Sequence, residues 1–195
     1  MTRVVHPIEQ ASYAILRRRL DLSHLPPLSR AVAERVVHAS TDFGYADDLV
    51  LDEQALQAGR VALAAGAPVV ADVRMVAAGI TGHDVVCHVR SAEPRAGETR
   101  SSAAVREALD EVGPGAVWVV GCAPTALQTL IELSRSAGAA PALVVGLPVG
   151  FVGAAESKAA LRGSGLPSVS NKSEKGGAAV AAAALNALLY AEEPA

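Results

Sequence analysis

The first third of the chain carries apolar residues at the spacing of a helix. They recur every three or four positions over residues 7–20 and again over residues 26–39. Both segments open on proline, which the first turn of a helix tolerates. A third segment of this kind covers about residues 52–65 and stops at Gly66. The pattern therefore predicts three helices before the main run of strands.

Beyond Gly66, short apolar runs alternate with helical patterns. Strands are predicted at 68–72, 84–89, 116–121, 141–146 and 166–170. Helices are predicted at 99–112, 123–138, 153–163 and 177–190. Apolar strands joined by single helices are typical of a mostly parallel sheet with helices on both faces. We therefore expect an α/β fold, a three-layer α/β/α domain over residues 1–195, with a charged tail at 191–195 that frays.

Composition narrows the classes of protein. The 195 residues suit one domain, and with 51% hydrophobic but only 3% aromatic residues the core must be built from Ala, Val, Leu and Ile. A net charge of −3 gives no reason to expect a nucleic acid or an anionic membrane as partner. No apolar run reaches the roughly 18 residues of a membrane span, and the start lacks a signal-peptide pattern. Cys87 and Cys122 lie in apolar runs without CxxC spacing, so we expect buried, reduced thiols and a cytoplasmic protein.

Arg35 and His38 end the second predicted helix and give the first candidate chemistry. His38 flanks the apolar stripe between Glu34 and Asp42, and both carboxylates would favour its protonated form. A protonated histidine is a candidate general acid near neutral pH, and a surface histidine without a role is the alternative. Arg35 points toward the apolar stripe and needs an anionic partner. That partner is either an aspartate of the following turn or an anionic ligand in a pocket shared with His38.

Other candidate anion-binding groups lie at predicted helix starts. Thr99, Ser101 or Ser102 could cap the helix that begins near residue 99. A cation such as Arg100 at this positive helix end is more natural if an anion docks there. Turns 121–127 and 146–158 follow strands, where parallel sheets collect ligands. The two-lysine turn 171–177 is either a binding loop or an ordinary solvated turn.

Three further features leave their alternatives open. Arg17 belongs to the basic run 17–19, which is a solvated face unless Arg17 reaches inward. Ser12 is a small polar residue on a largely apolar helix and carries little meaning alone. Asp47 and Asp48 are expected only to start the next turn.

Several common sites are excluded by their missing motifs. The chain has no GxGxxG, GxxxxGK[ST] or GxSxG, which argues against a dinucleotide, a P-loop nucleotide and a serine hydrolase. HDVVCH (83–88) resembles a metal cluster, but on a strand its residues face opposite sides, so we expect no metal. The residues alone thus predict a polyanion pocket lined by Arg35, Arg100 and helix N-termini, with His38 as a candidate proton donor, and they name no reaction.

Several segments together resemble a known family. They are RVVHASTDF (35–43), ADVRMVAAGIT (71–81), GETRSSAA (97–104), APTAL…PALVVGLPVGFVGAAESK (123–158) and KGGAAVAAAALNALL (175–189). In this order, and over nearly the whole chain, they are similar to the precorrin-8X methylmutases of cobalamin biosynthesis, the cobalt-precorrin-8 enzymes included. GxPVGFVGAAESK is the most specific of these motifs.

The resemblance implies an isomerase that moves a methyl group between adjacent ring-C carbons of a contracted tetrapyrrole. The product would be hydrogenobyrinate, or cobyrinate where cobalt is present, and both forms agree with the sequence. It implies no cofactor, and a homodimer with pockets at the subunit interface. The substrate's many carboxylates suit arginines, and its flat, mostly apolar ring suits an aliphatic cleft. The alternative is a corrinoid carrier of the same pathway without catalysis.

The resemblance also assigns roles to residues. The family's Arg-x-x-His pattern matches Arg35 and His38, and its essential histidine is therefore His38. Its serine in the first helix matches Ser12, its threonine after Gly-Ile matches Thr81, and its Thr-Arg-Ser segment places Arg100. With His38 as the catalytic residue, the predicted substrate-binding residues are Ser12, Arg17, Arg35, Thr81, Thr99, Arg100 and Lys158.

Overall fold

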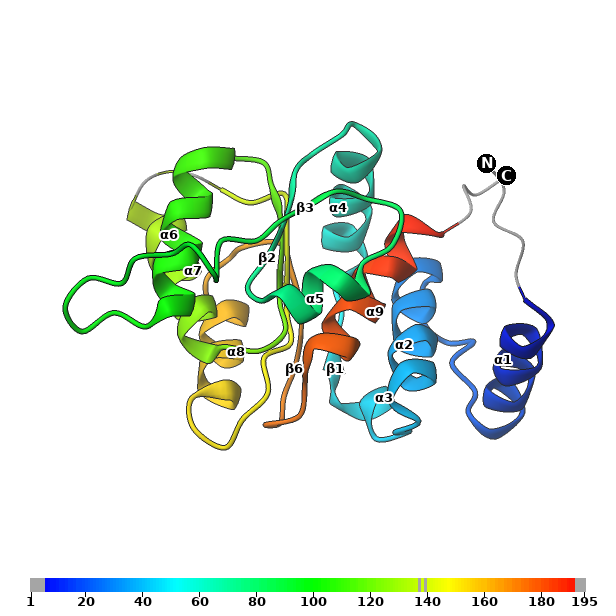
Figure 1. Ribbon diagram of the computed structural model, residues 1–195. Helices are drawn as coiled ribbons and strands as arrows, with labels where there is room; N and C mark the ends of the chain where they lie inside the picture. The colour runs from blue at the N-terminus through cyan, green and yellow to red at the C-terminus, as the bar shows by residue number, and fades with distance from the viewer. Residues whose placement is uncertain (1–5, 137, 139, 192–195) are drawn as a thin grey trace.

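A six-stranded sheet forms the centre of the molecule in the computed structural model, which describes residues 6–136, 138 and 140–191 (Figure 1). Residues 192–195 of the tail expected to fray lie outside that range. The strands are β1 (Leu49–Val50), β2 (Val69–Ala71), β3 (Val85–Val86), β4 (Val117–Val120), β5 (Leu143–Gly146) and β6 (Ser168–Asn171). They are ordered β1-β6-β5-β4-β2-β3, and only the β1–β6 pair is antiparallel. The predicted mostly parallel sheet is confirmed.

Nine helices of the described chain surround this sheet. They are α1 (Pro7–Arg19), α2 (Pro27–Ser40), α3 (Tyr45–Asp48), α4 (Glu53–Ala64), α5 (Arg74–Gly79), α6 (Arg100–Val112), α7 (Pro124–Ser136), α8 (Ala154–Arg162) and α9 (Ala178–Leu189). All seven helices predicted from periodicity are confirmed within a few residues. The sequence did not predict α3, α5 and β1, because four, six and two residues are too few to display a period.

The helices form two layers with separate cores. Figure 1 shows α2, α4, α5 and α9 on one face of the sheet and α6, α7 and α8 on the other. The strand side chains alternate accordingly: Val117 and Val119 belong to the first core, and Trp118 and Val120 to the second. β4 and β5 are buried along their whole length, as expected for central parallel strands covered on both faces. The three-layer α/β/α prediction is confirmed.

Two helices place the candidate site within this frame. α9 is rich in alanine, almost wholly buried, and packs on α2, α4, α5 and the central strands. α1 lies outside the layers and packs against α2 (Figure 1). No helix in the described part of the chain is long and apolar enough to cross a membrane.

Gly121 shows how tightly these layers meet. It follows β4, and a Cβ there would lie 2.8 Å from Ala181 Cβ and 2.8 Å from Val76 Cγ2. These atoms belong to α9 and α5, so both helices approach the strand end only because position 121 has no side chain.

We therefore expect Gly121→Ala to lower the free energy of unfolding by about 1–3 kcal/mol through overpacking, measured by urea denaturation. Gly163→Ala is the matched control, because Gly163 has φ −80° and its nearest heavy atom would lie 3.6 Å from a new Cβ. That control should be neutral or stabilising by up to about 1 kcal/mol. Equal stability changes in the two variants would contradict the close-packing argument.

Candidate active site

His38 lies in the last turn of α2 and is held by two residues of α1. Its Nδ1 lies 2.9 Å from the Ser12 hydroxyl. The Tyr13 ring stacks on the imidazole, with 4.8 Å between ring centroids and 11° between planes. His38 is half-buried, and its Nε2 has no hydrogen-bond partner among residues 6–136, 138 and 140–191. One ring nitrogen is thus fixed by the protein while the other stays available to a ligand.

An ion pair between exposed Arg17 and buried Glu34 lies behind this stack. The Arg17 guanidinium donates from Nε to both Glu34 carboxylate oxygens, at 3.1 and 3.2 Å, and from Nη2 at 2.7 Å. Arg17 also lies over the Tyr13 ring, 5.6 Å from its centroid. The Glu34 hydrogen bonds raise the pKa of Arg17. The Glu34 carboxylate, which was expected to favour protonation of His38, is hydrogen-bonded to Arg17 instead.

Arg35 lies one helical turn before His38 and uses few of its donors. Its guanidinium lies over the Tyr190 ring, 5.2 Å from the centroid, and 3.8 Å from the Glu9 carboxylate. It donates no hydrogen bond to the part of the chain that the structure describes. The alternative in which an aspartate of the following turn neutralises Arg35 is therefore wrong. The side chain is about one-fifth exposed (19%), so its N–H groups can still meet an anion.

Thr81 is fixed by two side chains from the end of α9. The Tyr190 hydroxyl lies 2.5 Å from Thr81 Oγ1 and donates to the Thr81 carbonyl at 3.0 Å. One turn earlier, Asn186 accepts from the Thr81 N–H at 3.1 Å and donates to the Gly79 carbonyl at 2.8 Å. Tyr190 thus connects Thr81 with Arg35. Sequence reasoning missed Tyr190, and its only signal is a tyrosine four residues after a buried asparagine.

Thr99 and Arg100 lie at the start of α6, on the other face of the sheet from α2. Thr99 is the N-cap of α6 and accepts from the Ser102 N–H at 3.1 Å. Its hydroxyl also lies 2.9 Å from the hydroxyl of Thr125 in α7. Arg100 is exposed and makes no hydrogen bond or ion pair with any described residue. Of the three candidate caps, Thr99 is the one that caps the helix, and Arg100 has all its donors available.

Asp72 holds the neighbouring turn between β4 and α7. It is only 3% exposed, and its carboxylate accepts from the N–H groups of Gly121, Cys122 and Ala123 at 2.8–3.0 Å. Burial raises the pKa of Asp72 despite these three donors. Because this turn leads into Thr125, Asp72 indirectly positions the segment that contacts Thr99.

Lys158 is the predicted binding residue whose surroundings differ most from the expectation. The side chain is fully buried, and its ammonium donates to Asn171 Oδ1 at 2.8 Å and to the carbonyls of Ser173 and Lys175, both at 2.6 Å. All three protons are therefore used inside the protein. Lys158 supports the 171–177 turn, and its geometry leaves no donor for a ligand.

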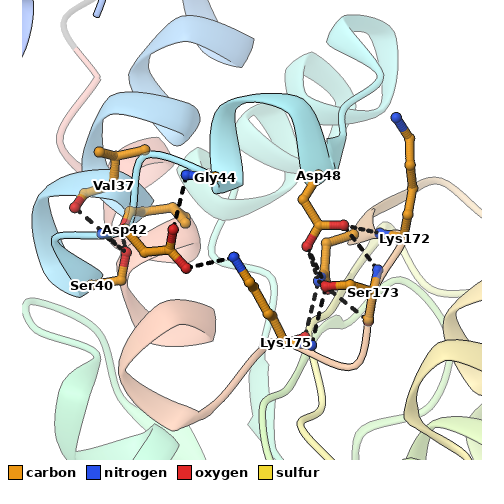
Figure 2. A network of polar contacts seen from close by, with 10 residues as sticks. Val37, Ser40, Asp42, Gly44, Asp48, Lys172, Ser173 and Lys175 are labelled. Atoms are coloured by element: carbon orange, nitrogen blue, oxygen red, sulfur yellow. Dashed lines mark hydrogen bonds and ion pairs between the residues drawn. The ribbon is translucent and has the colours of Figure 1, made fainter. Parts of the chain in front are cut away.

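The aspartates after α2 reach the same turn, as Figure 2 shows. Asp42 pairs with Lys175 at 2.7 Å and accepts from the Gly44 N–H at 2.8 Å. The Lys175 hydrogen bond lowers the pKa of Asp42. Asp42, which was expected to keep His38 protonated, forms its ion pair with Lys175 instead.

Asp48 makes more hydrogen bonds to the 171–177 turn than Asp42 does. It accepts from Asn171 Nδ2 at 2.7 Å, from the Ser173 hydroxyl at 2.6 Å and from the N–H groups of Lys172 and Ser173. Burial alone would raise the pKa of Asp48, but these hydrogen bonds outweigh it and lower the pKa. The Lys172 ammonium donates to the Asp47 carbonyl at 2.9 Å. The 171–177 turn is thus tied to α3 and is not a freely solvated loop.

The two histidines of the HDVVCH segment (83–88) contact neighbouring protein groups, and the two cysteines of the chain are unpaired. His83 Nδ1 lies 2.7 Å from the Asp84 carbonyl, and His88 Nε2 lies 2.8 Å from the Glu111 carboxylate. Within the described ranges, no three His, Cys, Asp or Glu side chains gather into a metal site. Both cysteines are free, but Cys87 is only half-buried and Cys122 is exposed, so the prediction of two buried thiols is wrong.

The predicted site residues thus form two groups, while Lys158 supports the 171–177 turn. Ser12, Arg17, Arg35, His38 and Thr81 lie around α1, α2 and the end of α9. Thr99 and Arg100 lie at the start of α6. This arrangement defines an α/β protein of the parallel-sheet class with a half-buried histidine and two separate arginines that have donors left for anions.

Comparison with known proteins gives the family. The family model that describes precorrin-8X methylmutase matches residues 7–191. The precorrin-8X methylmutase of Pseudomonas aeruginosa is 42% identical and covers 95% of this chain and 95% of its own. The cobalt-precorrin-8 methylmutase of Priestia megaterium is 36% identical over 93% of this chain and 85% of its own. A crystal structure of precorrin-8x methyl mutase from Thermus thermophilus superposes with a TM-score of 0.84 at 36% identity, covering 93% of each chain.

The chain belongs to the precorrin-8X methylmutase family. Its activity is that of a methylmutase, an isomerase of cobalamin biosynthesis.

The Lys158 cluster predicts a pH-dependent stability. Burial lowers the pKa of Lys158 from 10.5 to about 8. Between these values the unfolded chain binds a proton that the folded chain has lost, so this group makes stability rise with pH above about 8. Lys158→Met should remove that rise and, near pH 7, lower the free energy of unfolding by about 3 kcal/mol, because three acceptors, among them the fully buried Asn171 side chain, lose their donor.

Urea denaturation between about pH 7 and 9.5 measures both effects. Tyr45, whose pKa is raised to about 12, contributes only above this range. Lys172→Met is the matched control, because this exposed lysine lies in the same turn. It should change stability by less than about 0.5 kcal/mol and keep the wild-type pH slope. A Lys158→Met slope equal to that of wild type would refute the assignment.

Proposed function

We propose that His38 supplies the proton that promotes methyl migration between adjacent ring-C carbons of precorrin-8X or its cobalt form. The observation that carries this proposal is the 2.9 Å contact of Nδ1 with Ser12, together with the Tyr13 ring that fixes the imidazole plane. Nε2 is then the nitrogen that presents the proton. A proton held near ring C polarises the conjugated system, and a positioned general acid contributes ~100- to 10,000-fold in rate.

Ser12 has a second use in this scheme. Its hydroxyl can accept a hydrogen bond from Nδ1–H or donate one to a bare Nδ1. The contact with His38 therefore persists whether Nε2 carries a proton or has released it. Migration of the methyl group needs no covalent intermediate with the protein, so a fixed geometry and one movable proton are sufficient.

Arg35 and Thr81 are the proposed carboxylate-binding groups beside His38. The Tyr190 ring supports the Arg35 guanidinium without using its N–H donors, which leaves the planar fork for a carboxylate. Arg17 remains a predicted contact, although its pairing with Glu34 occupies part of its fork. We assign Lys158 to support of the 171–177 turn in place of direct substrate contact.

We further propose that the active site is composite, with His38 of one subunit facing Arg100 of a second. Within one chain the sheet lies between α2 and α6, so a single substrate does not readily span both groups (Figure 1). A two-fold dimer would bring the two faces together twice. A homodimer, a cytoplasmic location, and a substrate other than nucleic acid or membrane are predictions of the sequence that this proposal retains.

The role of His38 is tested by incubating the purified protein with precorrin-8X and following the visible spectrum. Wild type should convert the substrate to hydrogenobyrinate. His38→Ala should lower kcat by about 100- to 10,000-fold while still binding the product, because the proton donor is lost but the carboxylate contacts remain.

His24→Ala is the matched control, since His24 is exposed in the turn between α1 and α2. It should keep the wild-type kcat and KM. Full activity of His38→Ala would remove His38 from the mechanism, and product binding without turnover by wild type would favour the carrier.

The composite site is tested by mixing two inactive variants. If His38 of one subunit works with Arg100 of its partner, a hybrid of His38→Ala and Arg100→Ala chains carries one intact site. Random reassociation makes half of the dimers hybrid, so about a quarter of wild-type activity should return. No recovery would place both residues in one chain's site, and near-normal activity of Arg100→Ala alone would remove Arg100 from it.

A further inference from the structure

The loop between β5 and α8 exposes an apolar surface. Val149, Phe151 and Val152 have 45%, 98% and 88% of their surface exposed. Large apolar side chains rarely gather this far into solvent unless they meet a ligand or a partner. We call these three residues the 149–152 platform.

Backbone contacts fix the platform from behind. The Gly150 N–H donates to the Glu174 carbonyl at 3.1 Å, and the Gly177 N–H donates to the Leu147 carbonyl at 2.9 Å. Both bonds join the loop to the 171–177 turn, which Lys158 and Asp48 hold in place. The apolar side chains are thus presented by an anchored backbone.

A chain of contacts connects the platform with Arg100. The backbone of Gly153 packs on Pro124, whose Cβ lies 3.5 Å from where a Cβ of residue 153 would be. The next residue, Thr125, meets the Thr99 hydroxyl at 2.9 Å, and Arg100 follows Thr99. An apolar surface and a cation with all its donors available therefore lie on one side of the molecule, where α6, α7 and α8 begin.

We propose that the 149–152 platform is the apolar part of the substrate site and packs on one face of the tetrapyrrole ring, while Arg100 binds a carboxylate at its rim. The ligand class is a flat macrocycle with an apolar face and anionic edges. The charge of Arg100 and the exposure of Phe151 and Val152 match these two features. This inference rests on the proposed substrate, and it adds a binding surface that the histidine group does not contain.

Phe151→Ser tests the proposal directly, because a side chain that is 98% exposed contributes little to the fold. With precorrin-8X we expect KM to rise about 10-fold, since the ring loses an apolar contact, and kcat to stay within about twofold. Phe151→Leu should restore most of the affinity, because it keeps an apolar side chain at the same position. Circular dichroism and the unfolding midpoint should remain those of wild type.

Val61→Ser is the matched control, because Val61 on α4 is also apolar and exposed, at 59%. It should leave KM unchanged. A second copy of the chain is the other occupant that an apolar surface can have, so the mass of each variant is measured by sedimentation. Phe151→Ser should keep the wild-type mass.

Three results would overturn the platform: an unchanged KM in Phe151→Ser, an equal rise of KM in Val61→Ser, or conversion of wild-type dimers to monomers by Phe151→Ser. Failure of the proposed function looks different, because wild type itself would then not convert precorrin-8X.

Discussion

The close packing of α9 against α2, α5 and the central strands is the constraint on which the site depends. Alanine supplies most of the buried positions of α9, and small side chains allow helix and sheet backbones to approach. Gly79 and Gly121 extend this packing, since a Cβ at either position would lie 2.8 Å from an alanine Cβ of α9. The polar end of α9 then fixes Thr81 through Asn186 and Tyr190, and Tyr190 supports Arg35. Two predicted binding residues from distant segments thus share one scaffold.

The distribution of charge inside the molecule separates supporting residues from available ones. Glu34 has Arg17, Asp48 has the donors of the 171–177 turn, Asp72 has three backbone N–H groups, and Lys158 has three acceptors. Buried charges need such partners. By contrast, Arg35 and Arg100 donate no hydrogen bond to a described residue. A polyanionic substrate is the partner that would use those donors.

The sequence predicted the long elements and missed the contacts between them. Helices of nine residues or more display a period and carry proline, Thr99 or glycine at their ends, whereas α3, α5 and β1 are too short to do so. Arg35 and His38 could be grouped from the sequence because they lie one helical turn apart. The contact of Ser12 with His38 and that of Thr81 with Tyr190 join residues 26 and 109 positions apart, which periodicity cannot reveal. Asp42 and Glu34 were matched to His38 because they are its neighbours in sequence, but stronger partners from Lys175 and Arg17 reach them in the fold.

The chemistry explains why these supports matter more than a reactive side chain. A methyl shift within one substrate forms no bond to the protein, so its barrier is lowered chiefly by orientation and by a charge at the right place. The stack of Arg17, Tyr13 and His38 gives such an orientation to the imidazole, and Glu34 holds the arginine behind the Tyr13 ring by hydrogen bonds. Glu34 therefore contributes to the site through Arg17 and Tyr13, as part of the scaffold that holds the imidazole.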